Sequence, residues 1–256
     1  MVVTILGCGT STGVPLIHCS CSVCQSHDPK NQRLRASVWI QTQGKSILVD
    51  TSTDLRQQAL RERIPRIDAV LYTHPHADHI HGIDELRSFN FVQREKIPVY
   101  GNAWTCRELK TKFAYIFSPG PSAGGGIPHL ELNEFDASVE RLNVSDIEVI
   151  PLPVLHGQKE CVGYRIGPVA YITDCSSIPQ TSLDKLKGIS HLILDCVRIQ
   201  AHDTHFNLEN ALEAVQKIQP QSTYLTHLGH DFDFSTYSRI LPKGVFLAYD
   251  GLRIEP

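Results

Sequence analysis

The chain alternates short apolar runs with polar segments that are rich in turn-forming residues. Several of the runs are continuously apolar and rich in Val, Ile and Leu, a pattern typical of strands that are buried on both faces of a layered fold. The strands predicted in this way are 2–6, 38–42, 47–50, 69–72, 147–152, 162–166, 169–173, 192–195 and 223–226.

Helical spacing of apolar residues appears in segments between these strands. Residues 207–219 place Leu208, Leu212 and Val215 on one face, and residues 54–63 open with Asp54, a good N-cap residue. Early strands follow one another closely, whereas later strands alternate with helices. This order predicts one α+β domain over residues 1–256, an αββα sandwich of two mixed β-sheets flanked by helices. Residues 118–129 are dense in Gly and Pro, which predicts a mobile surface loop within that domain.

Composition supports a single enzyme-sized domain and narrows its partners. The chain has 256 residues, of which 41% are hydrophobic, enough for a sizeable core. Its net charge of -3 and the lack of a basic run argue against a nucleic-acid partner. There is no apolar run of about 18 residues and no signal-peptide pattern. We therefore expect a cytoplasmic protein with no membrane partner.

The strongest chemical signal is the segment Thr-His-Pro-His-Ala-Asp-His at 73–79, directly after the predicted strand 69–72. It supplies four potential metal ligands within six residues: His74, His76, Asp78 and His79. Imidazole and carboxylate groups suit Zn, Mn or Fe, and one loop rarely gives so many ligands to one ion. The spacing predicts two ions and disfavours a polar loop with chance histidines.

Three later strands each end in a further ligand-type residue. His156, Asp174 and His227 follow apolar runs, as His74 does. One histidine at a strand end is an ordinary surface or core residue, but the repetition favours a shared site.

The order H-x-H-x-D-H, then His, Asp and His, resembles the metallo-β-lactamase superfamily over essentially the whole chain. The resemblance implies that one ion is bound by His74, His76 and His156, the second by Asp78, His79 and His227, and both by Asp174. Asp78 is expected to be a catalytic residue as well as a ligand. Asp50 matches an acidic residue that orients the ligand loop from behind. The family usually has glycine two positions later, where this chain has Ser52, so the turn is expected to differ.

Two N-terminal features narrow the resemblance. The glycine-rich segment 6–15 is a weak phosphate-loop signal alone, but it resembles the opening of the RNase Z-like branch. The next residues carry Cys19, Cys21 and Cys24, and together these features resemble the PhnP-like phosphoribosyl 1,2-cyclic phosphate phosphodiesterases. That resemblance implies a structural zinc loop at about 18–24, with His230 as the fourth ligand and His18 as a competitor. A disulfide framework is not expected, because such chains are short and secreted.

The resemblance also implies a histidine that donates a proton. PhnP-like enzymes carry a histidine near the position of His205, which here precedes the predicted helix 207–219. His205 is expected to protonate the departing oxygen. His202 is its competitor, and a helix-capping role for His205 is the structural alternative.

These expectations combine into a binuclear phosphodiesterase. A metal-bridging hydroxide would open a small cyclic phosphodiester, with two Zn²⁺ or Mn²⁺ ions at the catalytic site and one structural Zn²⁺ elsewhere. The alternatives are an RNase Z-like nuclease, an ester, thioester or lactone hydrolase, a PqqB-like protein of quinone cofactor biosynthesis and a zinc-stabilised binding module. A nuclease is disfavoured because the chain has no long arm. A homodimer is possible.

Overall fold

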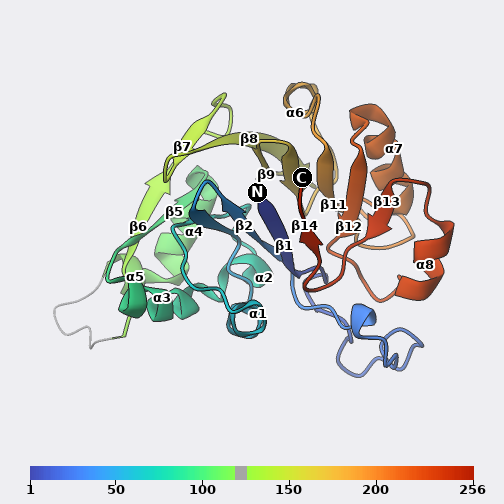
Figure 1. The fold of residues 1–256 in the computed structure, drawn as a ribbon, viewed down its shortest axis with the longest axis horizontal. Helices are drawn as coiled ribbons and strands as arrows, with labels where there is room; N and C mark the ends of the chain where they lie inside the picture. Colours follow the sequence, from blue (N-terminus) through green and yellow to red (C-terminus); the bar gives the residue numbers. More distant parts are fainter. Residues whose placement is uncertain (119–125) are drawn as a thin grey trace.

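The computed structural model describes residues 1–118 and 126–256, and it contains two seven-stranded sheets that pack face to face (Figure 1). Strands β1 and β14 pair antiparallel, so segments from both ends of the chain lie side by side in the first sheet. That sheet has the order β14 (Arg253–Ile254), β1 (Val2–Gly7), β2 (Ser37–Thr42), β3 (Lys45–Val49), β4 (Ala69–Leu71), β5 (Ile97–Gly101) and β6 (Leu130–Glu134).

The second sheet, like the first, combines parallel and antiparallel strand pairs. Its first four strands are parallel neighbours and its last four are antiparallel neighbours. The order is β13 (Val245–Leu247), β12 (Ser222–Thr226), β11 (His191–Asp195), β10 (Val169–Ile172), β9 (Lys159–Ile166), β8 (Ile147–His156) and β7 (Leu142–Val144).

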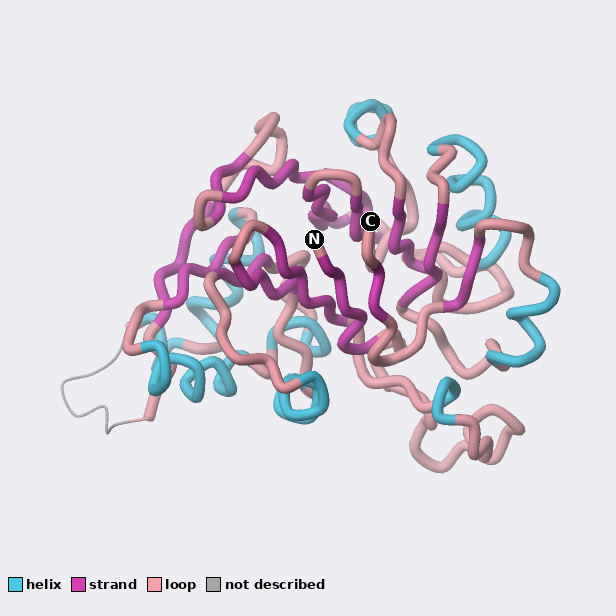
Figure 2. Tube along the Cα trace, in the orientation of Figure 1, coloured by secondary structure: helices cyan, strands magenta, loops and turns pink. Residues whose placement is uncertain are grey.

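Helices cover the outer faces of both sheets (Figure 2). On the first sheet these are α1 (Leu55–Glu62), α2 (Ala77–Ile80), α3 (Leu86–Gln93), α4 (Ala103–Lys112) and α5 (Ala114–Phe117). On the second they are α6 (Gln180–Lys185), α7 (Leu208–Ile218) and α8 (Phe234–Ile240). Two 3₁₀ turns, Pro29–Asn31 and Ile83–Glu85, complete the regular structure of the described residues. None of the described helices is long and apolar enough to cross a membrane.

The continuous apolar runs are explained by burial on both faces of the sheets. In β3, Ile47 and Val49 join the cluster between the sheets, whereas Leu48 joins the cluster beneath the helices. The expected αββα sandwich is therefore confirmed. Every predicted strand is present, with small shifts at its ends. The 118–129 loop falls mostly on residues 119–125, outside the described residues.

One local expectation was wrong. Asp54 precedes α1, but its side chain makes no capping hydrogen bond to the helix. Its carboxylate instead accepts from the backbone N–H of Arg35 at 2.8 Å and from the Arg35 guanidinium at 3.1 Å. A hydrogen bond to a charged guanidinium is stronger than one to a backbone N–H, so the Asp54 carboxylate bonds to Arg35 and does not cap α1. The Asn207 side chain does cap α7, since it accepts from the backbone N–H of Asn210 at 2.9 Å.

Gly82 brings two loops into direct contact. Its N–H donates to the carbonyl of Thr51 at 2.9 Å, and a Cβ at this position would lie 1.9 Å from the carbonyl oxygen of Ser52. The loop that leaves α2 is thus packed against the loop that follows β3. Ser52 itself is buried, and its hydroxyl donates to Gln58 at 3.0 Å.

We expect Gly82→Ala to lower the free energy of unfolding by about 1–3 kcal/mol, because the new methyl group forces the two loops apart. Urea denaturation followed by circular dichroism measures this change. Gly44→Asn is the control: it lies in the β2–β3 turn with φ +75° and nothing within 4 Å. Equal effects of the two substitutions would contradict the close approach.

Candidate metal centre

The predicted ligands converge at one end of the two sheets. His74 and His76 lie in the connection from β4 to α2, His156 ends β8, and Asp174 and His227 follow β10 and β12. Asp174 and His227 have positive φ angles of 51° and 58°, a left-handed conformation uncommon outside glycine. Such backbone strain is typical of functional sites, where surrounding structure holds the residue in place.

Two overlapping clusters of expected ligand atoms form the centre, and a third group joins Asp174 and His227 to Asp195 and His205. The ligand atoms of each cluster lie within 4.8 Å of one another. The first contains His74, His76, His156 and Asp174, and the second contains Asp78, His79, Asp174 and His227. The structure thus brings together all seven residues expected from the sequence, and Asp174 is common to both clusters.

Asp50 fixes the ligand loop from behind. One carboxylate oxygen accepts from the backbone N–H of Thr73, and the other accepts from the Thr73 hydroxyl and from Nδ1 of His79, each at 2.8 Å. Because Nδ1 of His79 donates to Asp50, its Nε2 faces the other way, toward the centre. That atom lies 3.2 Å from carboxylate oxygens of both Asp78 and Asp174.

Two further histidines are oriented in the same way. Nδ1 of His156 donates to the carbonyl of Thr204 at 2.7 Å. The Thr73 hydroxyl donates to Asp50, so Nδ1 of His74 donates to that hydroxyl at 3.0 Å. Both rings therefore turn Nε2 toward the centre, the arrangement that metal-binding histidines adopt. Nε2 of His74 lies 2.9 Å from Nδ1 of His76.

The charges of the ligand residues depend on one another. Nearby carboxylates, Asp174 first, outweigh burial and raise the pKa of His79 well above its usual value and that of His227 to about 9. Burial lowers the pKa of His74 well below its usual value, so this ring is neutral. Burial would raise the pKa of Asp174, but His227 and His79 outweigh it and hold this pKa well below its usual range. Burial and His79 act in the same opposed way on Asp78, whose pKa is also lowered. The centre holds two ionised carboxylates that require positive charge nearby.

Several buried atoms at the centre have no hydrogen-bond partner among residues 1–118 and 126–256. They include Oδ2 of Asp78, Nε2 of His79 and Nε2 of His227. Buried polar atoms in folded proteins are almost always satisfied, and these are atoms that bind divalent cations. The residues present therefore fit a metal centre.

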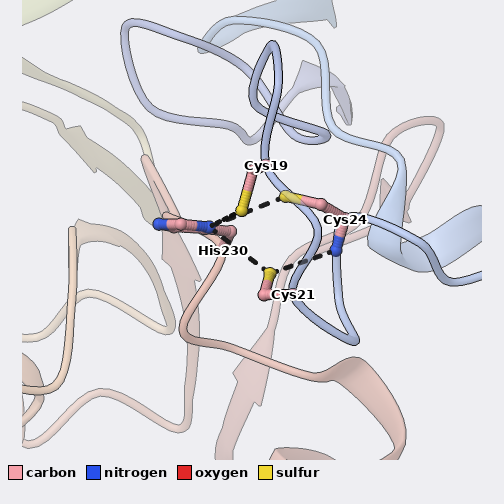
Figure 3. Close-up of side chains that lie close together, drawn as sticks. All are labelled: Cys19, Cys21, Cys24 and His230. Atoms are coloured by element: carbon pink, nitrogen blue, oxygen red, sulfur yellow. Dashed lines mark hydrogen bonds between the residues drawn. The ribbon is translucent and has the colours of Figure 1, made fainter.

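The cysteine cluster forms a separate site (Figure 3). The Sγ atoms of Cys19, Cys21 and Cys24 lie 3.2, 3.5 and 3.6 Å from Nδ1 of His230. The backbone N–H of Cys24 donates to the Cys21 sulfur and is the main cause that lowers the pKa of this thiol to about 6. Three sulfurs and one imidazole nitrogen at this spacing suit a closed tetrahedral zinc site. The competitor His18 is exposed and lies outside the cluster.

Asp195 is a central residue that the sequence interpretation did not select. It is fully buried at the end of β11 and accepts from the backbone N–H groups of Cys175 and Phe206 at 3.0 and 3.2 Å. The same carboxylate lies 3.1 Å from Nδ1 of His205 and 3.5 Å from Nδ1 of His227. The sequence did carry one signal for Asp195: like Asp50, it is an aspartate that ends an apolar strand.

The structure separates His205 from its competitor His202. The His205 ring stacks on His227 with a centroid distance of 4.9 Å, and its Nε2 lies 3.9 Å from Asp174. His202 lies one layer further out, with its ring 4.9 Å from that of His205. Only His205 therefore borders the ligand clusters, while its role as proton donor stays a prediction.

With this geometry established, comparison with known proteins identifies the family. The model of the β-lactamase superfamily domain matches residues 45–228. The chain belongs to the metallo-β-lactamase superfamily. A crystal structure described as a new diphosphatase from the PhnP family is 43% identical, with a TM-score of 0.91 over 99% of this chain and 97% of that one. The chain is therefore PhnP-like over nearly its whole length.

Other similar proteins carry different names. The octanoyltransferase of Porphyromonas gingivalis is 36% identical over 97% of this chain, which spans 50% of that relative's length. The zinc-bound PqqB of Methylobacterium extorquens has a TM-score of 0.78 at 20% identity, and the short form of human tRNase Z has 0.69 at 17% identity. Both matches span 100% of this chain. They span 100% of the PqqB chain and 99% of the tRNase Z chain. At these identities the last two show a shared fold.

We expect Asp50→Asn to weaken the metal centre without removing a ligand. The amide cannot accept from Thr73 and His79 together, so His79 loses its fixed orientation. Thermal unfolding should show a loss of about 1.5–3 kcal/mol, and metal titration a loss of affinity of about 10–100-fold. Asp146→Asn changes an exposed carboxylate 3.4 Å from Lys45 and should alter neither. Full metal affinity in Asp50→Asn would contradict the orienting role.

Proposed function

We propose that the protein is a phosphodiesterase that hydrolyses a small cyclic phosphodiester, such as phosphoribosyl 1,2-cyclic phosphate. The observation that carries this proposal is the sharing of Asp174 by both ligand clusters. A carboxylate shared by two sites suits a pair of divalent ions about 3.5–4 Å apart, a separation that suits displacement at phosphorus. The similarity to a PhnP-family diphosphatase supports hydrolysis at phosphorus, although a diphosphatase cleaves an anhydride rather than a diester.

The assignment of ligands follows the two clusters. His74, His76 and His156 would hold one ion, and Asp78, His79 and His227 would hold the second, with Asp174 contacting both. Zn²⁺ or Mn²⁺ suits this mixture of imidazole and carboxylate. Such ions, when bound, lower the pKa of water and neutralise phosphate oxygens. A third ion, Zn²⁺, would fill the site formed by Cys19, Cys21, Cys24 and His230, which has no position left for substrate.

His205 is placed to deliver a proton. Asp195 accepts from Nδ1 of His205 at 3.1 Å, so Nε2 faces the centre with a proton when the ring is charged. The ring is mostly buried, with 11% of the side chain exposed, and it borders the two clusters. From this position His205 can hold the proton for the departing oxygen of the diester.

An acyl ester or thioester hydrolase is the second candidate. It is favoured by the similarity to the octanoyltransferase of Porphyromonas gingivalis, although that name belongs to a protein about twice as long. The same centre could direct attack at a carbonyl carbon, so the chemistry at the metals alone does not separate the two classes.

We expect the wild-type protein to hydrolyse bis(p-nitrophenyl) phosphate, and His74→Ala and Asp174→Ala to abolish this activity. Both variants remove a ligand and should keep the circular dichroism spectrum of the folded protein. His27→Ala, an exposed histidine outside both clusters, is the control and should retain full activity. Unchanged turnover in both ligand variants would refute the proposal. Hydrolysis of p-nitrophenyl octanoate without phosphodiester turnover would favour the second candidate.

The proton-donor role predicts a dependence on the leaving group. His205→Ala should slow hydrolysis of dialkyl diesters by about 10²–10⁴-fold, because an alkoxide must be protonated as it departs. Diesters that release p-nitrophenolate should slow much less, because that anion leaves without a proton. Steady-state rates for the two substrate types measure the difference. If His202→Ala shows this pattern and His205→Ala does not, His202 is the donor.

A further inference from the structure

The segment that carries the cysteine cluster has very little hydrophobic core of its own. Residues 10–28 contain no helix or strand, and they project from the sheets at the lower right of Figure 1. Their buried apolar side chains, Val14, Val23 and Cys24, form a small cluster apart from the two large clusters of the sandwich. Hydrophobic stabilisation grows with the apolar area buried, so this cluster contributes little. The fold of the segment therefore depends on metal binding by the cysteines and His230.

Two cysteines of the cluster are placed to form a disulfide with each other. Cys21 is partly exposed, Cys24 is 9% exposed, and the ligand atoms of the cluster lie within 4.8 Å of one another. The backbone N–H of Cys24 donates to Sγ of Cys21 at 3.4 Å (Figure 3). The two residues have the C-x-x-C spacing found in redox-active thiol pairs. An S–S bond of about 2.05 Å between them requires only a local movement.

The remaining cysteines outside the cluster are closed to solvent. Each of these five side chains is 0% exposed: Cys8, Cys106, Cys161, Cys175 and Cys196. Buried cysteines are inert toward reagents in solution, whereas partly exposed thiolates react. An oxidant that reaches the folded protein therefore meets the thiols of the cluster first.

Backbone hydrogen bonds connect the cluster to the loop of the proposed proton donor. The N–H of Gly229, next to His230, donates to the carbonyl of Val197 at 2.8 Å. The N–H of Val197 in turn donates to the carbonyl of Phe206 at 3.0 Å, and Phe206 directly follows His205. A movement of His230 therefore disturbs the segment that holds His205.

The cluster segment also forms one wall of a cleft beside this loop. The cleft has a volume of about 370 Å³, and its lining includes Thr10 and Leu16 from the N-terminal segment, His230 and His202. The ring of His202 lies 4.9 Å from that of His205. Loss of order in residues 10–28 would remove the wall that Leu16 belongs to and expose this side of the site to water.

We infer that the cysteine cluster is a redox-sensitive switch that hydrogen peroxide opens. The Cys21 thiolate takes one oxygen from peroxide to form a sulfenic acid, and the other oxygen leaves as water with a proton from solvent. The Cys24 thiolate then attacks the Cys21 sulfur, the S–S bond forms, and the sulfenic oxygen leaves as a second water with a second proton. The two sulfurs lose two electrons, and peroxide gains them.

The consequence is loss of the structural zinc. Cys19 and His230 alone cannot complete a closed tetrahedral site, so the ion is released and residues 10–28 lose their order. A reductant that restores the two thiols would reverse the change. The inference rests on the structural zinc proposed above and not on the reaction at the metal centre.

The first test counts the zinc that peroxide releases from Asp174→Ala, which lacks the ligand shared by the two catalytic clusters. The folded variant should contain about one zinc ion per chain, held by the cysteine cluster. After peroxide treatment and catalase, a chromogenic chelator should detect this zinc in solution, and mass spectrometry should find the Cys21–Cys24 disulfide. A phosphine reductant with added zinc should restore the content. Cys106→Ala in the same background is the matched control and should release zinc equally, because Cys106 is buried outside the cluster.

The second test follows backbone hydrogen exchange in the wild-type, metal-loaded protein. Oxidation should raise the exchange rates of residues 10–28 by about 10-fold or more, because their local stability is lost, and leave those of β3 unchanged. Cys24→Ser, which removes one ligand, should show the fast exchange without peroxide. Hydrolysis of bis(p-nitrophenyl) phosphate should fall by about 10-fold or more on oxidation and recover on reduction, because His205 is displaced.

Zinc that stays bound after peroxide treatment would overturn the switch. So would zinc release without a disulfide in the cluster, absence of zinc from folded Asp174→Ala before treatment, or unchanged exchange in residues 10–28. These readouts need no substrate, so they decide the inference even if the proposed phosphodiesterase function fails. If that function holds, full activity of the oxidised, zinc-depleted protein would also overturn it.

Discussion

Two ionised carboxylates in a buried centre are the constraint around which this molecule is organised. Asp78 and Asp174 are 8% and 2% exposed, and a buried anion is costly unless it is compensated by positive charge. The fold meets this requirement with histidines from both sheets, because β4, β8, β10 and β12 all deliver their ends to the same place. Asp50 accepts from Nδ1 of His79 and Asp195 accepts from Nδ1 of His205, so each carboxylate fixes which nitrogen of its histidine faces inward. The metal centre and the sandwich therefore depend on each other. The two sheets bring together two carboxylates that would otherwise repel each other.

The central part of this construction was predictable from sequence, because its signals are local. The ligand loop is a short motif after an apolar strand, and the paired sheets follow from runs buried on both faces. Asp195 was not selected, since its significance depends on His205 and Cys175, which reach it only in the folded chain. Edge strands such as β7 and β14 are short and carry partly exposed residues, so their apolar pattern is weak. The prediction that Asp54 caps α1 was wrong for a related reason. Its carboxylate accepts from Arg35, which belongs to a distant segment.

Proteins that share this fold carry different names. Proteins named as a diphosphatase, an octanoyltransferase, PqqB and tRNase Z all match this chain over nearly its whole length. A common scaffold that carries such different names indicates that substrate choice lies in the walls around the centre. In this chain those walls are the start of α4, the β8–β9 turn and the loop that carries His202 and His205. Differences among relatives in these three segments are therefore more informative about substrate than the ligand residues.

The cysteine cluster ties the N-terminal loop to a residue near the other end of the chain. Cys19 and His230 are 211 residues apart, and His227 lies three positions before His230. During synthesis on the ribosome, neither site can be completed until residues 227–230 have emerged. The first sheet faces a similar delay, because β1 must wait for β14. Nascent chains of this protein would therefore carry three unpaired thiols and an incomplete metal centre until that point. Protection of those thiols from oxidation or from the wrong metal would fall to the cell.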